Sequence, residues 1–375
     1  MLKRILDSDV LEPDTFSYHG VLDAWANSGR EEALDKVVQI FHHMEGLHKD
    51  GKNVKPTIRT VNAILNTYAK LATKYVSPAR YQDKQYEKAA ECASKAQDFL
   101  NESKMKYEET SDADWRPDVT SYTILMDIYS KCGDYDATQK AEKLLQELKD
   151  AYADTKDPRI RPNFRTYTTL ITAWARTWSP KSPGRVEELL KEMSQDESTK
   201  PNSRAYTSAI QCWAKSKEPL KAKRVLKLLM EMKDMHKKTG QDDIRPTILT
   251  YNSAIDACAR CQGSMEQQTE ALKIAFAIFK SAQADAAIRV NGTTFSTVLK
   301  AVGYLLPAGN ERNQVASAIF EKAKNAGMVE VNGVKTLRKC VDHVVMVKLM
   351  EGTAVDQYGN FDYYNMPAAW TKNTK

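Results

Sequence analysis

The sequence predicts an all-α fold, a right-handed α-solenoid of about seven helix-turn-helix repeats with a partial eighth. Three observations predict it. A phrase that begins with Pro and continues as an amphipathic helix recurs along the chain. A second amphipathic pattern follows each copy, and neither helix can bury its apolar face alone. The length of 375 residues is large for a single compact core and suits an elongated array.

The clearest copy of the phrase runs from Pro117 to Lys131. Pro117 stops any preceding helix, and Asp118 is a good residue to cap the next one. Copies start at Pro13, Pro56, Pro117, Pro162, Pro201, Pro246, Val290 and Val331, the last as a vestige. The intervals between these starts range from 39 to 61 residues.

These starts divide the chain into three parts. Residues 1–12 look like the remnant of a preceding helix, which suggests that the array extends before Met1. Residues 13–350 form the repeat array, with the largest insertion near 71–85, between the two helices of the second repeat. Residues 351–375 form an irregular tail, rich in aromatic residues, that either caps the last hairpin or is loosely attached.

The first helix of each repeat carries one apolar stripe. Tyr122, Leu125, Met126 and Tyr129 follow the i, i+3, i+4, i+7 spacing of a buried helix face. Equivalent stripes are Tyr18-Val21-Leu22-Trp25, Tyr167-Leu170-Ile171-Trp174, Tyr206-Ala209-Ile210-Trp213 and Tyr251-Ala254-Ile255-Cys258. The second helices carry similar stripes, so stacked hairpins would bury both continuously.

A row of polar residues accompanies each stripe, starting directly after the aromatic residue and continuing in steps of four. Such steps predict one side of the helix, about opposite the stripe. The first members are His19, Asn62, Thr123, Thr168, Thr207, Asn252 and Ser296. The last members are basic in five consecutive repeats: Lys70, Lys131, Arg176, Lys215 and Arg260.

One cation per repeat would match a polyphosphate backbone. Alternatively, these cations favour the helix dipole and are merely solvated. Three repeats add an Arg near the helix start, at Arg59, Arg165 and Arg204, whose planar group can stack on bases.

The opening P-[DN]-x-x-[TS]-Y-[NT]-x-x-[IL] and the second-helix pattern resemble pentatricopeptide repeat proteins over residues 13–345. The intervals here are longer than the typical unit of that family. In the family, the first row member and the residue that closes the repeat after its Pro together read one RNA base. We call these two residues a reading pair.

The resemblance implies a base for most pairs. Asn62 with Asp118 implies U, Thr123 with Asn163 implies A, Thr168 with Asn202 implies A, Thr207 with Thr247 implies an unresolved purine, Asn252 with Asn291 implies C, and Ser296 with Asn332 implies A. His19 with Thr57 departs from the pattern and implies nothing. The expected site is U-A-A-purine-C-A, read from 5′ to 3′ along the chain.

The resemblance therefore implies a non-enzymatic protein that binds single-stranded RNA in mitochondria or chloroplasts and acts in RNA stability, processing or translation. Other proteins of organellar RNA metabolism form a second class of partner. The alternative is a protein-protein interaction scaffold that uses the same surface. The sequence suggests no cofactor, and no apolar run has the length needed to span a membrane.

Two motifs suggest metal chemistry and are set aside. Cys258-Ala-Arg-Cys261 is a single CxxC, which cannot complete a tetrahedral zinc site without further ligands, and Cys258 falls on the apolar stripe. His43-Met-Glu45 matches half of a zinc deaminase signature, but no Pro-Cys-x-x-Cys follows it. The six dispersed Cys residues are typical of reduced thiols in an intracellular compartment.

Overall fold

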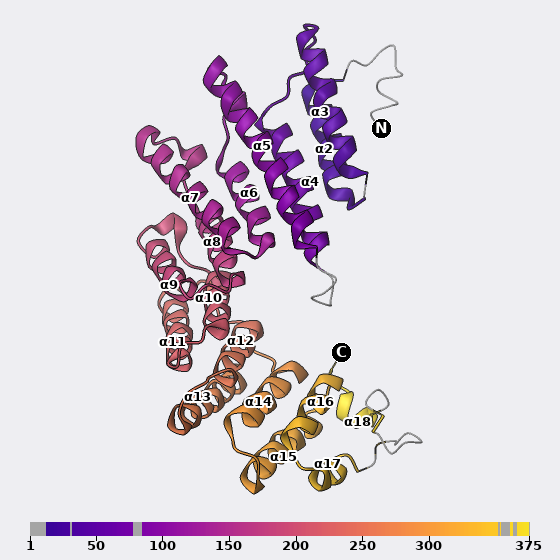
Figure 1. Ribbon diagram of the computed structural model, residues 1–375, viewed down its shortest axis with the longest axis vertical. Helices are drawn as coiled ribbons and strands as arrows, with labels where there is room; N and C mark the ends of the chain where they lie inside the picture. Colours follow the sequence, from indigo (N-terminus) through magenta and orange to yellow (C-terminus); the bar gives the residue numbers. More distant parts are fainter. Residues whose placement is uncertain are drawn as a thin grey trace. The chain divides into compact units, whose positions relative to one another are not determined.

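The computed structural model describes residues 13–30, 32–77, 85–351, 353, 361–362 and 366–374 (Figure 1). Its α-helices are α2 (Thr15–Ser28), α3 (Ala33–Lys49), α4 (Ile58–Val76), α5 (Tyr86–Thr110), α6 (Val119–Cys132), α7 (Tyr135–Thr155), α8 (Phe164–Arg176), α9 (Ser182–Met193), α10 (Ser203–Lys215), α11 (Lys221–Thr239), α12 (Ile248–Ala259), α13 (Met265–Ala284), α14 (Gly292–Leu305), α15 (Asn310–Asn325), α16 (Val331–Cys340), α17 (His343–Leu349) and α18 (Ala368–Thr371). The predicted fold class is confirmed: the described chain is an all-α array of helical hairpins. The expected helix remnant at 1–12 lies outside the described residues.

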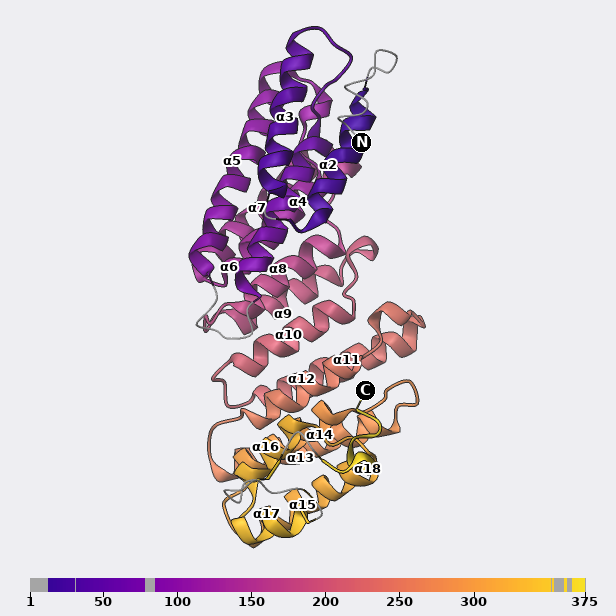
Figure 2. The same cartoon turned by 90° about the vertical axis from the view of Figure 1, so that its right-hand side faces the viewer.

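The described chain forms two compact units. The first comprises Met1–Ser179 and Lys191–Lys200, and the second comprises Pro180–Leu190 and Pro201–Lys375. In the first unit, α2, α4, α6 and α8 pack side by side in chain order, and each of α2, α4 and α6 also packs on the helix that follows it (Figures 1 and 2). In the second unit, α10, α12, α14 and α16 stack in the same way. We call these eight the first helices.

The apolar stripes of the first helices form the core. Leu125, Met126, Leu170, Ile171 and Ile255 are fully buried, as are many equivalents on the second helices. The predicted stripes are thus confirmed from α6 to α12, whereas Val21 and Trp25 at the start of the array are only partly buried. Cys258 is fully buried on its stripe, and all six Cys residues are buried free thiols.

The boundaries between repeats, where each first helix begins, share one local structure. The Asp118 side chain accepts a hydrogen bond from Ser121 N, which caps α6, and Ser121 Oγ meets the Asp118 backbone in return. Asn163, Asn202, Thr247 and Asn291 cap α8, α10, α12 and α14 similarly. Short 3₁₀ turns precede four of the boundaries, at Ala113–Trp115, Pro158–Ile160, Glu197–Thr199 and Asp242–Ile244.

The insertion expected at 71–85 is in part helical. Residues 71–76 extend α4 to Val76, because this stretch contains no Gly or Pro and Ala72 is fully buried. Residues 78–84 lie outside the described residues. The expectation that residues 71–85 lie between the two helices of the second repeat was therefore wrong for 71–76, which belong to α4.

The described part of the C-terminal tail packs on the last hairpins. Trp370 in α18 meets the Phe320 ring edge-to-face, and Trp370 O accepts a hydrogen bond from Val329 N. Asn373 N donates to Gly327 O, where the chain has a φ of +65° after α15. For residues 366–374 the capping alternative is the one observed. Within the described chain, no helix is both long and apolar enough to cross a membrane.

Candidate nucleic-acid interface

Several first members of the polar row contact the next first helix: His19 contacts Thr60, Thr123 contacts Thr166 and Thr207 contacts Thr250. His19, Thr168 and Thr207 are buried. The expectation that the whole row lies opposite the stripe was wrong, because a helix turns by about 100° per residue. The first member therefore flanks the stripe, and only after eight further residues does the row reach the opposite side.

The reading pair Thr123 and Asn163 meets through a third residue. Thr123 Oγ1 donates to Val119 O at 2.7 Å and lies 3.2 Å from Thr166 Oγ1 of α8. Asn163 Oδ1 accepts from Arg165 N at 2.9 Å and from Thr166 N at 3.3 Å. The Asn163 amide oxygen is thus committed to the helix start, which leaves its Nδ2 to face outward.

The pair Asn62 and Asp118 meets directly. Asn62 Nδ2 donates to Asp118 Oδ1 at 3.3 Å, the same oxygen that accepts from Ser121. Asn62 Oδ1 is buried and, within the described chain, has no hydrogen-bond partner; Asn252 Oδ1 is in the same state. A buried carbonyl without a donor is costly, and a ligand that donates to it would relieve that cost.

The pair Thr207 and Thr247 again meets through a residue of the next helix. Thr207 Oγ1 donates to Ser203 O at 2.7 Å and lies 2.8 Å from Thr250 Oγ1. Thr250 Oγ1 lies 3.1 Å from Thr247 Oγ1 and accepts from Thr247 N at 3.1 Å. A continuous chain of three hydroxyls therefore links α10 to the cap of α12.

The remaining pairs are less uniform. Thr168, in the first unit, donates to Phe164 O at 2.6 Å, and Asn202, in the second unit, caps α10 through Ala205 N at 3.0 Å. Asn291 caps α14 through Thr294 N at 3.0 Å. Asn332 differs from the other closing residues, since it lies inside α16 and Glu330 takes the N-cap position. Ser296 Oγ instead lies 3.4 Å from Thr336 Oγ1.

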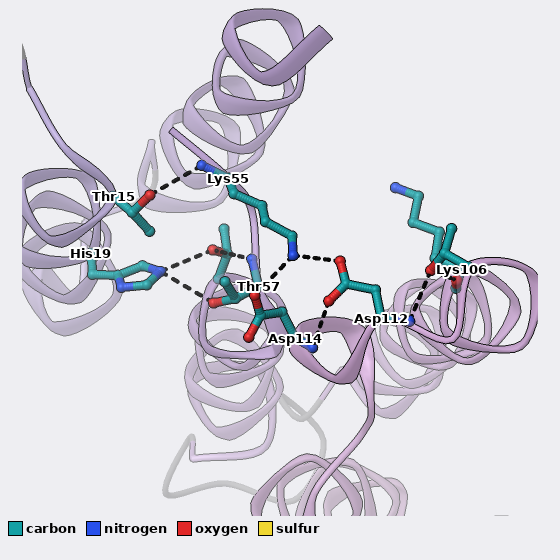
Figure 3. Close-up of polar contacts among 9 residues, drawn as sticks. Thr15, His19, Lys55, Thr57, Lys106, Asp112 and Asp114 are labelled. Atoms are coloured by element: carbon teal, nitrogen blue, oxygen red, sulfur yellow. Dashed lines mark hydrogen bonds and ion pairs between the residues drawn. The ribbon is translucent and has the colours of Figure 1, made fainter. Parts of the chain in front are cut away.

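The pair His19 and Thr57, to which the resemblance assigns no base, forms a separate cluster of polar side chains (Figure 3). His19 Nε2 lies 3.1 Å from Thr60 Oγ1 and 3.4 Å from Thr57 Oγ1. Burial lowers the pKa of His19 below its ordinary value, with a smaller contribution from the Arg59 cation. Burial thus favours the neutral form of His19, whose ring is held between two hydroxyls.

The cations at the end of the row have partners on the protein. Lys70 Nζ donates to Ala26 O at 2.7 Å, and Arg176 Nη1 donates to Ser130 O at 3.1 Å, so each contacts the last turn of the preceding first helix. Lys131 pairs with Asp127 at 3.1 Å, and only 11% of its side chain is exposed. The alternative that these cations are merely solvated therefore does not describe Lys70, Lys131 and Arg176.

The last two row cations lie in the second unit. Arg260 donates to Asp256 at 2.6 Å, and Lys300 of the next helix donates to the other oxygen of that carboxylate at 2.5 Å. Lys215 is partly exposed at the end of α10. Of the three Arg residues near helix starts, Arg59 pairs with Asp23 at 3.1 Å, Arg165 lies 5.9 Å from the Phe164 ring centre, and Arg204 is exposed.

A second recurring set of charged residues, at the boundaries between repeats, was not predicted from the sequence. The residue before the boundary Pro is basic, and it pairs with an Asp that caps the turn before the next boundary. The pairs are Arg116 with Asp157 at 2.6 Å, Arg161 with Asp196 at 2.8 Å, Arg245 with Asp285 at 3.3 Å, and Lys55 with Asp112 and with Asp114 at 2.8 Å. Figure 3 shows Lys55 reaching both carboxylates. The signal was present in the sequence, as [KR]-P at five boundaries.

Family models match this chain at three places. The model described as the pentatricopeptide repeat domain matches residues 1–70 and 188–260, and the model described as the PPR repeat matches residues 120–151. The chain contains pentatricopeptide repeats. The resemblance to pentatricopeptide repeat proteins, which rested on the motif that opens each repeat and on the second-helix pattern, is confirmed.

Solved structures of one pentatricopeptide repeat protein are similar to this chain. The maize protein PPR10 matches with 18% identity and a TM-score of 0.49 over 93% of this chain and 47% of that chain. PPR10 in complex with an 18-nt psaJ RNA element matches with 15% identity and a TM-score of 0.33 over 90% of this chain and 48% of that chain. The chain thus spans about half the length of these structures. A comparison with curated protein sequences found no significant match.

Proposed function

We propose that this pentatricopeptide repeat protein binds single-stranded RNA and reads one base with each reading pair. The observation that carries the proposal is the fixed orientation of the closing residues at the helix caps. A residue that must hold a helix start with one atom has only its other atoms left for a base. The chemistry of those atoms then decides which base fits.

Asn163 illustrates a donor. Its Oδ1 accepts from two backbone N–H groups, so Nδ2 faces outward and donates. Adenine and cytosine present an acceptor ring nitrogen on their Watson–Crick edge, which such a donor can meet. This supports A or C wherever Asn closes the repeat.

Asp118 illustrates an acceptor. Its hydrogen bonds all run to Oδ1, and an ionised carboxylate accepts at both oxygens. Uracil and guanine present a ring N–H on the same edge, so an Asp at the closing position favours U or G. The neighbouring Asn62 then favours the pyrimidine, as the family resemblance implies.

The row cations support contact with the phosphate backbone. Lys131, Arg176 and Arg260 recur at one position, and a phosphate could share them with the carboxylates and carbonyls that they contact now. Neutralising several phosphates releases counterions, so binding would weaken steeply with salt.

Membership of the family favours a role in mitochondria or chloroplasts, on transcripts whose stability, processing or translation depends on a bound protein. The mechanism we propose is passive. The protein occupies its RNA site and thereby blocks nucleases or remodels RNA structure, and further proteins of organellar RNA metabolism act with it.

The proposal is tested by binding of an RNA that contains U-A-A-purine-C-A against a scrambled RNA of equal composition. We expect the matched RNA to bind more tightly, and both to weaken with salt. Lys131→Ala should weaken both RNAs alike, whereas Lys143→Ala, an exposed lysine on α7, should change neither. Equal affinity for the two RNAs would remove the base-reading proposal. Binding that ignores salt would remove the RNA interface and favour a protein scaffold.

A further inference from the structure

The chain of hydroxyls formed by Thr207, Thr250 and Thr247 has a defined direction. Each threonine hydroxyl has one proton to donate and can accept two hydrogen bonds. Ser203 O is a carbonyl and can only accept. Because Thr207 Oγ1 lies 2.7 Å from Ser203 O, the Thr207 proton lies between them.

The direction of the next bond follows. Thr207 has no second proton, so Thr250 donates across the 2.8 Å that separate the two hydroxyls. Thr250 then has none left for Thr247, and Thr247 donates across the 3.1 Å between Thr247 Oγ1 and Thr250 Oγ1. Thr250 also accepts from Thr247 N at 3.1 Å, which completes its bonding capacity.

Both members of this reading pair can therefore only accept a hydrogen bond from a base; neither has a proton left to donate. Thr207 donates to Ser203 O and accepts from Thr250, so one lone pair remains. Thr247 donates to Thr250 and accepts from Thr250 N at 3.4 Å, so again one lone pair remains. The pair Thr123 and Asn163 differs, because there a hydroxyl acceptor stands beside an amide donor.

We infer that the repeat beginning at Pro201 selects guanine over adenine, and that Thr250 is the positioning residue that fixes this preference. The inference rests on the proposed function, which supplies the pairing of Thr207 with Thr247. Guanine offers two adjacent donors, N1–H and the N2 amino group, to two acceptors. Adenine would set its N1 lone pair against a lone pair of the protein, which is an unsatisfied contact.

Thr250 suits a positioning role because it is fully buried and cannot touch RNA. It also occupies the third position of α12, where Thr60, Ser121, Thr166 and Thr294 stand in other first helices and Ala205 stands in α10. The hydroxyl at this position is thus a recurrent feature of the fold, but its effect on base preference depends on the cap residue that it contacts.

The test uses the full chain and RNAs that contain U-A-A-x-C-A, with guanine, adenine, inosine or 2-aminopurine at x. We expect guanine to bind about tenfold more tightly than adenine, the effect of about one hydrogen bond. Inosine, which keeps N1–H and lacks the N2 amino group, should fall between them. Thr247→Asn adds an outward donor and should reverse the preference to adenine.

Thr250→Val and Thr250→Ser separate positioning from stability. The valine variant keeps the shape but frees the Thr247 hydroxyl to turn, so the guanine preference should fall at least threefold at x and at no other base. The serine variant keeps the hydroxyl and should retain the preference. A merely structural role would instead lower the melting temperature and weaken all RNAs alike, which would overturn the positioning role.

Three further results decide the inference. Discrimination at the other bases with adenine preferred or equal at x would overturn it and leave the proposed function standing. A guanine preference that survives Thr250→Val would overturn the role of Thr250. Absence of discrimination at every base would overturn the proposed function and this inference with it.

Discussion

Arg161 donates from Nη2 to both carboxylate oxygens of Asp196, at 3.0 and 2.8 Å. Asp196 also caps the 3₁₀ turn Glu197–Thr199 through Ser198 N, so one carboxylate shapes its own turn and ties it to the preceding boundary. Arg116 with Asp157 and Arg245 with Asp285 repeat this arrangement. Neighbouring repeats are thus joined by ion pairs at the boundary turns, a role separate from the RNA contact that we propose for the row cations.

The hydrogen bonds and ion pairs of Asp157 and Asp196 predict an acid-sensitive stability, and Asp157 also pairs with Arg159 of its own turn at 2.9 Å. Hydrogen bonds from Arg159 lower the pKa of Asp157 to about 2, and hydrogen bonds from Arg161 lower the pKa of Asp196 to about 2. A carboxyl group with a lowered pKa stabilises the folded state fully above its ordinary value of 3.8, and this contribution is lost as the pH falls towards 2. The free energy of unfolding should therefore fall steeply between about pH 4 and 2.

Urea unfolding from pH 2 to 5 checks this on the wild type and on the double variant Asp157→Asn, Asp196→Asn. The double variant should be less stable at pH 5 and show a shallower fall. Asp154→Asn, an exposed acid at the end of α7, should follow the wild type. Parallel curves for the wild type and the double variant would contradict the stabilising role of the two aspartates.

Asp118→Asn is predicted to change a base without disturbing the fold. Asn caps a helix as well as Asp does, so α6 should form normally. With Oδ1 held by Ser121 N, the new amide would turn a donor outward, and the preference of the pair with Asn62 should change from U to C by about tenfold. Competition binding with all four bases at the first site position measures it. Retention of U would contradict the orientation argument.

Asp127→Asn is predicted to strengthen RNA binding. Asp127 holds Lys131 at 3.1 Å, and removing that negative charge would free the cation for a phosphate. The affinity for matched and scrambled RNA should rise by a factor of about two to ten, as expected for a change of one charge near the backbone. Asp136→Asn makes the same charge change at the start of α7 and should have a smaller effect. Equal gains in RNA affinity for the two variants would mean that the net charge alone, and not the release of Lys131, determines the effect.

Trp370→Ala is predicted to loosen the last hairpins. Trp370 packs on Phe320, and its ring centre lies 4.4 Å from Lys324 Nζ, but the residue is only partly buried. The loss of stability should be about 1–2 kcal/mol, below that for a fully buried tryptophan. Hydrogen exchange should speed up at Val329 N, whose acceptor is Trp370 O. Val344→Ala, at a site 80% exposed, provides the control.

The helices could be predicted from the sequence, because the residues that cap each helix and form its apolar stripe lie within or directly beside that helix. Pro117, Asp118 and the Tyr122 stripe carry their own signals, and the structure agrees with them. The contacts between repeats were not predictable in this way. Which side of Thr207 meets Thr250 depends on how two helices pack, and no spacing within one helix reports that.

Asn332 shows where the pattern misleads. Val331-Asn332 looks like Val290-Asn291, but Asn291 has Thr294 three residues later to complete its capping box. The residue three after Asn332 is Lys335, which has no hydroxyl, and α16 begins earlier with Glu330 at its cap. The row cations themselves were predicted, but their partners were not: Asp127 lies one turn before Lys131 and Asp256 one turn before Arg260, and each carboxylate pairs with its cation.

The most direct test of the central claim is selection from a random RNA pool on the purified chain at near-physiological salt. The account predicts enrichment of U-A-A-G-C-A, or of close variants that keep the U, A and C positions. Enrichment of an unrelated motif would keep RNA binding and contradict the reading pairs. No enrichment, together with binding that does not respond to salt, would contradict the RNA interface itself.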